Sequence, residues 1–195
     1  MHGMMRGYVR GIEAVNHVIG RIVMWGIFAL MGVLFYSIWS KAFSLPALWT
    51  LEMAQFVMVA YYVLGGAYSM QTGAHVRMDL LYGDWSPRRK AWADLFTIWL
   101  LIFYLCVLIY GGVASAAYSL GYWGQTPFGF FAGLATGSEE IGTMERSSSA
   151  WRPYLWPIKG VMVLGFTLML LQCVAEFFRS VLVLRNDPMP ERIPA

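Results

Sequence analysis

Long runs of apolar residues constrain the fold of this chain more than any other feature. The clearest run, residues 22–40, contains no charged side chain and lies between Arg21 and Lys41. A helix needs about 20 apolar residues to cross the hydrocarbon core of a bilayer. Three similar runs follow, the first of them directly after Glu52. The pattern predicts an all-α integral membrane protein with four transmembrane helices, at about residues 22–40, 53–72, 93–118 and 157–178.

The composition of the chain agrees with a membrane location. Of its 195 residues, 58% are hydrophobic and only 13% are charged, whereas a soluble domain carries about 25% charged residues. So few charges cannot cover a soluble surface, and a disordered chain needs low hydrophobicity and high charge. The basic residues also form no long cluster of the kind that binds nucleic acid. The composition therefore excludes an ordinary soluble domain, a disordered chain and a nucleic-acid partner.

The distribution of Lys and Arg predicts the orientation of the spans. If the N-terminus is inside the cell, ten of the 14 Lys and Arg residues fall in inner segments. Inner loops of membrane proteins carry such an excess of positive charge. We therefore expect both termini in the cytoplasm. The predicted divisions are a cytoplasmic N-terminal segment at 1–21, a membrane domain at 22–178 and a cytoplasmic tail at 179–195.

The connections between the spans differ in character. Apolar and charged residues alternate irregularly along the inner connection, residues 73–92, which is typical of an amphipathic segment at the interface. The outer connection, residues 120–156, is long, apolar, and rich in glycine and aromatic residues, with no charge before Glu139. Its glycines and Pro127 argue against a fifth span. It either lies at the interface or against another membrane protein, or forms a shallow re-entrant hairpin.

Glu52 is the most conspicuous charge because it opens the second span. Ionisable groups inside spans are costly and often functional, which allows a proton or ion relay. The alternative, which we favour, places Glu52 at the outer interface near the positive end of the helix dipole. No histidine lies inside a span, and no metal-ligand spacing, nucleophile array or phosphate-binding loop is present. We therefore expect no enzyme activity, metal or cofactor in this chain.

Three sequence motifs, which occur in a fixed order along the chain, carry a resemblance to a known family. They are Trp-Thr-Leu-Glu at 49–52, Gly-Ala-His-Val-Arg-Met-Asp at 73–79, and Glu-Arg-Ser-Ser-Ser-Ala-Trp-Arg-Pro-Tyr-Leu-Trp-Pro-Ile-Lys at 145–159. With four spans and this length, the chain from about residue 13 to 185 resembles the small permease subunit of tripartite ATP-independent periplasmic (TRAP) transporters.

The resemblance implies a role and a set of partners. Such subunits lie in the bacterial inner membrane beside a larger permease subunit, which carries the substrate and sodium sites. A periplasmic solute-binding protein delivers an organic acid or similar solute, and an ion gradient drives its uptake. The small subunit then serves as a non-catalytic scaffold among membrane lipids. The motif residues carried over are candidates for structural or partner contacts: Trp49, Glu52, His75, Arg77, Asp79, Trp151 and Trp156.

Two other functions compete with this interpretation. The first is the membrane anchor of a respiratory complex that binds quinone or haem, which the absence of histidines inside the spans disfavours. The second is a self-sufficient small transporter that uses Glu52, which would require that carboxylate to lie deeper in the membrane. A visible absorption spectrum of the purified protein distinguishes the haem-binding alternative from the scaffold.

Overall fold

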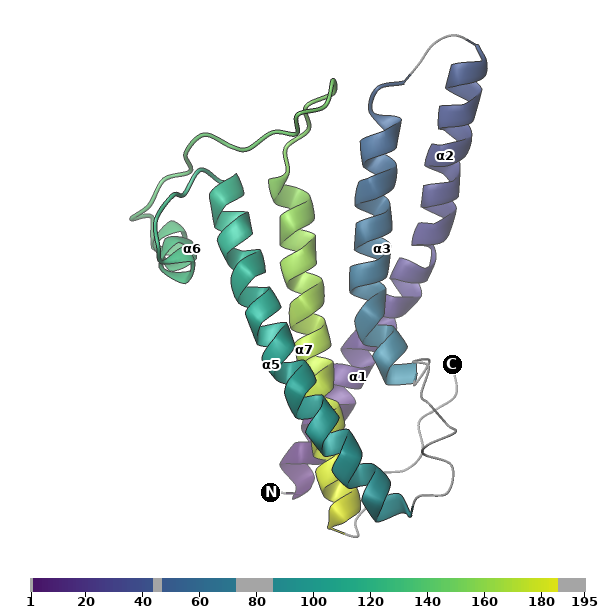
Figure 1. The fold of residues 1–195 in the computed structure, drawn as a ribbon, viewed down its shortest axis with the longest axis vertical. Helices are drawn as coiled ribbons and strands as arrows, with labels where there is room; N and C mark the ends of the chain where they lie inside the picture. Colours follow the sequence, from purple (N-terminus) through teal and green to yellow (C-terminus); the bar gives the residue numbers. More distant parts are fainter. Residues whose placement is uncertain (1, 44–46, 73–85, 186–195) are drawn as a thin grey trace.

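The structure, a computed structural model, describes residues 2–43, 47–72 and 86–185. The described part consists of helices joined by loops, without strands, which confirms the all-α class. The helices are α1 (His2–Met24), α2 (Gly26–Ala42), α3 (Thr50–Thr72), α5 (Pro87–Ser119), α6 (Pro127–Thr136) and α7 (Trp156–Leu184). The long helices form a bundle, and the short helix α6 lies beside it (Figure 1).

Three helical stretches of the described residues are long and apolar enough to cross a membrane. They are Gly3–Ala42, Trp92–Ser119 and Trp156–Leu184, and they contain the predicted first, third and fourth spans. The predicted second span, 53–72, lies within α3, whose 23 residues measure about 35 Å. Its tyrosines and Gln55 make α3 less apolar than the other three stretches. The number of four spans therefore stays a prediction.

Helices α1 and α2 form one long helical stretch that bends at Trp25. The Trp25 amide donates to the Ile22 carbonyl oxygen at 3.2 Å, and the Phe28 amide donates to the Trp25 carbonyl oxygen at 3.1 Å. These tighter bonds join the two helices at an angle (Figure 1). The whole stretch of 40 residues measures about 60 Å, about twice the thickness of a bilayer core. Only part of it can therefore cross a membrane.

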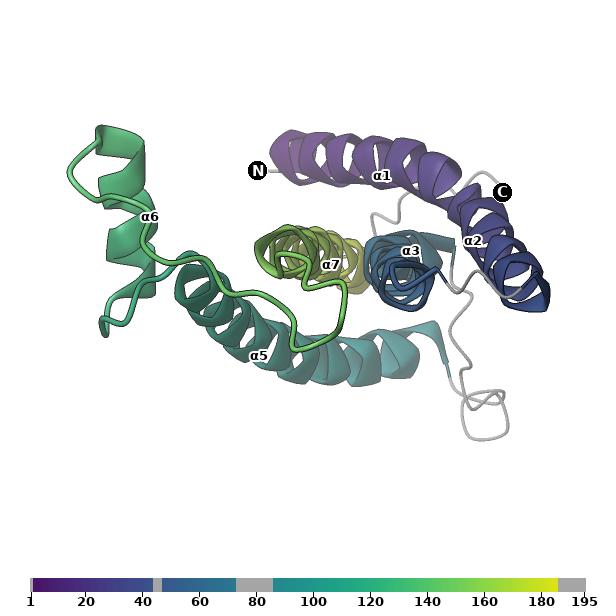
Figure 2. The same cartoon turned by 90° about the horizontal axis from the view of Figure 1, so that it is seen from above.

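Helix α7 is the centre of the fold. It packs against α5 on one side and against α3 and α1 on the other (Figure 2). Its buried side recurs at steps of three, four and seven residues, the spacing of helices packed at a shallow angle. This stripe is formed by Gly165, Leu168, Gln172, Ala175 and Leu182.

Glycines allow α7 to approach its neighbours closely. A Cβ atom built on Gly165 would lie 2.4 Å from Cγ1 of Val63 and 3.0 Å from the backbone of α3. A Cβ on Gly112 of α5 would lie 3.1 Å from Val163 of α7. Small residues at such contacts let membrane helices pack tightly. The sequence marks Gly112 as one of a small pair with Ala116, whereas Gly165 carries no such signal.

Polar side chains join α1 to α7 inside this packing. The Asn16 side-chain amide donates to Gln172 Oε1 at 2.7 Å, and both residues are fully buried. About two turns further along α7, Arg179 pairs with Glu13 at 2.6 Å. Most of the first 21 residues therefore form a helix that is bonded to the rest of the bundle.

Candidate interaction surface at the outer connection

The outer connection begins with a sharp turn over the end of α5. Gly121 has a φ of 88°, and a Cβ there would lie 2.7 Å from the backbone of Gly142. The Gly142 amide donates to the Leu120 carbonyl oxygen at 3.0 Å, and the Glu145 amide donates to the Ser119 carbonyl oxygen at 3.0 Å. Only glycine suits a position with both a positive φ and so close a backbone. The connection therefore folds back across the end of α5.

The middle of the connection forms the short helix α6. Pro127 stands in its first turn, and Gly137 ends it in the left-handed conformation, as is common at helix ends. The ten residues measure about 15 Å, half of what a bilayer core requires. Figures 1 and 2 show α6 lying crosswise to the long axis of the bundle, beside α5. Helix α6 therefore cannot be a fifth span.

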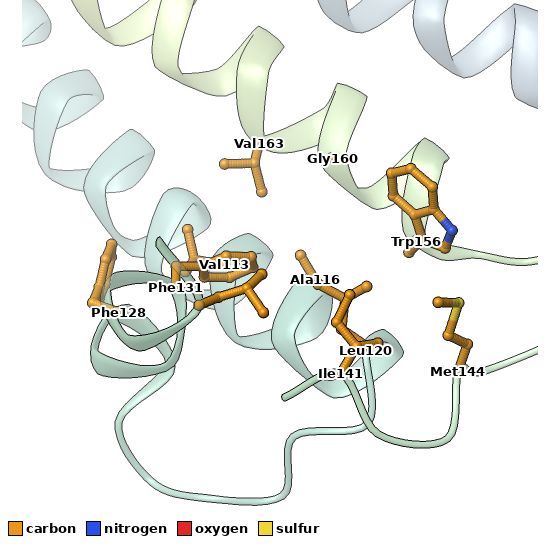
Figure 3. Close-up of a pocket in the computed structure, with 11 residues that line it drawn as sticks. Val113, Ala116, Leu120, Phe128, Phe131, Ile141, Met144, Trp156, Gly160 and Val163 are labelled. Atoms are coloured by element: carbon orange, nitrogen blue, oxygen red, sulfur yellow. The ribbon is translucent and has the colours of Figure 1, made fainter. Parts of the chain in front are cut away.

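An apolar pocket of about 570 Å³ lies between α5, α6 and α7. Figure 3 shows its walls: Phe128 and Phe131 approach from α6, while Val163 and Trp156 approach from α7. Trp156 is the one site residue predicted from the sequence that lines this pocket. The remaining lining residues are Val113, Ala116, Leu120, Leu134, Ile141, Met144 and Gly160. The pocket wall is almost entirely hydrocarbon, so it suits apolar groups.

Two polar contacts fasten the later part of the connection to the bundle. The Ser147 hydroxyl donates to Glu52 Oε1 at 2.5 Å, which joins the connection to the first turn of α3. Lys159 of α7 pairs with Glu145 at 2.5 Å and also donates to the carbonyl oxygen of Ser115 on α5 at 3.3 Å. These contacts link the outer ends of three helices through one loop.

The surroundings of Glu52 bear on its role. Its side chain is buried, with 8% of its surface exposed, at the first turn of α3, where the helix dipole favours an acidic group. Gln55 and Tyr62, which the sequence places on the same semi-polar face, are exposed. The described part of α3 therefore offers no buried polar path inward from Glu52. Its contact with Ser147 fits a structural role.

Residues 146–154 form a narrow projection on the connection. Arg146 and Tyr154 pair in a single antiparallel bridge, and the Ser147 amide donates to the Pro153 carbonyl oxygen at 2.9 Å. The Arg146 guanidinium also lies over the Tyr154 ring, 4.5 Å from its centroid. Trp151 lies between the paired residues and is exposed. The projection thus presents an aromatic side chain to its surroundings.

The Trp49–Glu52 motif forms the start of α3 and its contact with α2. The Trp49 ring stacks on Tyr36 of α2 with centroids 5.4 Å apart. The Thr50 hydroxyl donates to the Ser37 hydroxyl at 3.1 Å. This motif therefore fixes the hairpin of α2 and α3, next to the point where Ser147 reaches Glu52.

The predicted site residues do not form one cluster. Trp49 and Glu52 lie at the start of α3, Trp151 on the projection, and Trp156 in the pocket wall. His75, Arg77 and Asp79 lie outside the described residues. Sequence reasoning missed Glu145, Ser147 and Lys159 as individual contacts, although all three belong to the motif at 145–159. Their position in that motif was the feature of the sequence that could have marked them as contacts.

Large apolar side chains cover the outward sides of α2 and α5. They include Phe28, Phe35, Ile38 and Trp39 on α2, and Trp92, Phe96, Trp99, Phe103 and Tyr110 on α5. A soluble monomer rarely exposes such contiguous apolar surface, whereas lipid or a partner helix covers it naturally. The fold and this surface define a multi-pass α-helical membrane protein.

Comparison with known proteins identifies its family. The chain matches the model of the DctQ component of tripartite ATP-independent periplasmic transporters over residues 30–183. It therefore belongs to that family of small TRAP transporter membrane subunits, which confirms the resemblance seen in the three motifs. No curated protein and no solved structure matches the chain.

Proposed function

We propose that this chain is the non-catalytic scaffold of a TRAP transporter, which holds the large permease subunit in the bilayer while that subunit moves its substrate. The transporter imports an organic acid or similar solute with an ion gradient. Family membership over residues 30–183 is the observation that carries the proposal. The exposed apolar sides of α2 and α5 support it, because they provide ample surface for a membrane partner.

The proposed topology has four spans in the inner membrane and both termini in the cytoplasm. Helix α3 supplies the second span. It is long enough for a bilayer core, and it packs among α1, α2 and α7. In this orientation the outer connection, including the pocket and the projection, faces the periplasm.

The outer connection is the proposed contact surface for the partners. Its pocket is apolar and lies at the outer ends of α5 and α7, where a helix of the large subunit can cover it. The projection, which contains Trp151, extends beyond the ends of α5 and α7 (Figure 1), where the solute-binding protein docks. Trp49 and Glu52 act indirectly in this scheme, since they hold the hairpin against which the projection rests.

Gentle affinity purification from native membranes tests the scaffold. We expect a stoichiometric large permease subunit to remain bound and to be identified by mass spectrometry. A photo-crosslinking amino acid at Phe103, Phe35 or Phe128 then tells whether α5, α2 or α6 meets that subunit. Recovery of the chain alone, or with a redox flavoprotein, would overturn the proposal.

A further inference from the structure

Helix α1 has three distinct sides, and its packing accounts for only one of them. Val9, Asn16 and Gly20 are buried toward α3 and α7. The approach is close, because a Cβ on Gly20 would lie 2.3 Å from the Tyr68 ring. These residues recur at steps of seven and four, which places them on one side of a helix.

The second side of α1 is apolar and exposed. It contains Met4, Val15, Val18 and Ile22, whose exposed fractions range from 48% to 78%. They recur at steps of eleven, three and four residues, which again selects one side of the helix. Nothing in the described bundle covers this apolar stripe.

The third side of α1 is basic. Arg10 and Arg21 are both exposed, and at eleven residues apart they lie nearly in line on the helix. Arg6 and His17 fall on the same line, each four residues before one of these arginines. The basic line thus runs along most of the length of α1, roughly 130° around the helix from the centre of the apolar stripe.

The inclination of α1 suits a helix that lies in a membrane surface. In the view from above, α1 is seen along much of its length, while α3 is seen almost end-on (Figure 2). The bend at Trp25 separates this inclined part from α2, most of which lies in the uncharged run 22–40. Since the helical stretch of 40 residues is about twice as long as a bilayer core is thick, part of it must lie outside that core.

We propose that α1 is an interfacial helix that binds anionic phospholipid headgroups through Arg10 and Arg21, with its apolar stripe immersed among the acyl chains. Helices with an apolar side and a basic side bind anionic lipid surfaces in this way. The charge of α1 is complementary to the cytoplasmic leaflet, whose surface potential is negative. The inference rests on the proposed topology, with the N-terminus in the cytoplasm, and assigns this chain a lipid site separate from its contact with the large subunit.

Cysteine labelling of the full chain tests the placement of the helix. Val15→Cys and Arg10→Cys are made separately in a Cys106→Ser background, and each protein is placed in phosphatidylglycerol vesicles. Buried Cys173 stays as a control, because it reacts only if the bundle unfolds. We expect a water-soluble maleimide to label residue 10 in both vesicles and denaturant, and residue 15 only in denaturant. Labelling of both positions in vesicles, or of neither, would overturn the proposal.

The charge requirement is tested with Arg10→Gln/Arg21→Gln against Arg10→Lys/Arg21→Lys. From mixed phosphatidylglycerol and phosphatidylcholine membranes, the Gln variant should retain less phosphatidylglycerol, by as much as about fivefold per lost charge. The Lys variant should retain as much as the unaltered protein. Equal retention by all three proteins would overturn the lipid site.

Two further measurements complete the test. The first tells whether lipid or a protein covers the apolar stripe of α1, and the second tests the scaffold role separately. Protection of residue 15 that requires the co-expressed large subunit would show that a protein covers the stripe, and would overturn the proposal. Copurification of the large subunit is scored independently. Its loss would refute the scaffold role, while the labelling pattern in vesicles would still decide the placement of α1.

Discussion

The two ends of α7 are held in contrasting ways. Toward its C-terminus, α1 and α3 enclose it, and the buried Asn16–Gln172 bond joins it to α1. Toward its N-terminus, it faces an open apolar pocket, and the ion pair between Lys159 and Glu145 fastens it to a loop. The C-terminal end of α7 is closed, and its buried hydrogen bond fixes the alignment of the helices. The N-terminal end is open, and its apolar surface is available to another molecule. The open end is therefore the part of α7 that is available for assembly with a partner.

The largest expected effect comes from adding one methyl group where α7 packs against α3. Gly165→Ala should lower the free energy of unfolding by about 1–3 kcal/mol, because its Cβ would overlap Val63 and force the two helices apart. Thermal denaturation of the purified protein in detergent measures this change.

Gly160→Ala is the matched control, on the same helix but at the open end. No heavy atom lies within 4 Å of a Cβ built there, so this variant should be neutral or stabilised by up to about 1 kcal/mol. Equal destabilisation by the two variants would remove the distinction between the packed and the open surface of α7.

The next effect concerns the buried polar bond of the closed end. Asn16→Ala and Gln172→Ala, combined in a double-mutant cycle, should show a coupling energy of about 0.6 kcal/mol, with an upper limit of about 1.7 kcal/mol. Both side chains are buried, but side chains in the unfolded state also find partners in the membrane. A cycle that pairs Asn16 with the distant Ser147 should be additive. Coupling in that control would point to a change spread over the whole bundle.

At the open end, losing one hydroxyl should loosen the connection without unfolding the bundle. Ser147→Ala removes the donor to Glu52, which costs about 1 kcal/mol, or about fivefold in an opening equilibrium. Trypsin cleavage after the exposed Arg146 reports that opening. Ser148→Ala removes a neighbouring hydroxyl from an exposed residue and should leave cleavage unchanged. The hypothesis fails if both variants are cleaved equally fast.

The smallest effect is expected on the outward side of α2. Phe35→Leu should change the free energy of unfolding by less than about 0.5 kcal/mol, because the ring is 66% exposed and packs little within the chain. Phe130→Leu in α6 is the matched change at a buried ring, which is 2% exposed, and should cost more. Equal losses measured by thermal denaturation would mean that α2 has packing partners within the chain.

The sequence predicted those features that depend on local composition. Apolar runs predicted α2, α3, α5 and α7 but not α1 or α6. The fourth predicted span begins within one residue of the start of α7, and the motif at 145–159 contributed to the resemblance to the family. Contacts between distant segments escaped prediction because single side chains determine them. The residues next to Asn16 and Gln172 in the sequence do not indicate that these two side chains are in contact. Gly165 allows close packing only because Val63 lies opposite it in the folded chain. Likewise, Ser147 gained its role only when the chain brought it back to Glu52.

The evenly spaced stripe on α7 limits how the length of this chain can vary. One residue inserted between Gly165 and Gln172 would rotate everything beyond it by about 100°, which would turn Gln172 away from Asn16. An insertion beside the exposed Glu140 shifts no helix relative to another, since that stretch joins α6 to the segment that Gly142 fastens to α5. Among related chains, differences in length should therefore accumulate in the loop beside α6, and the spacing from 165 to 182 should stay constant.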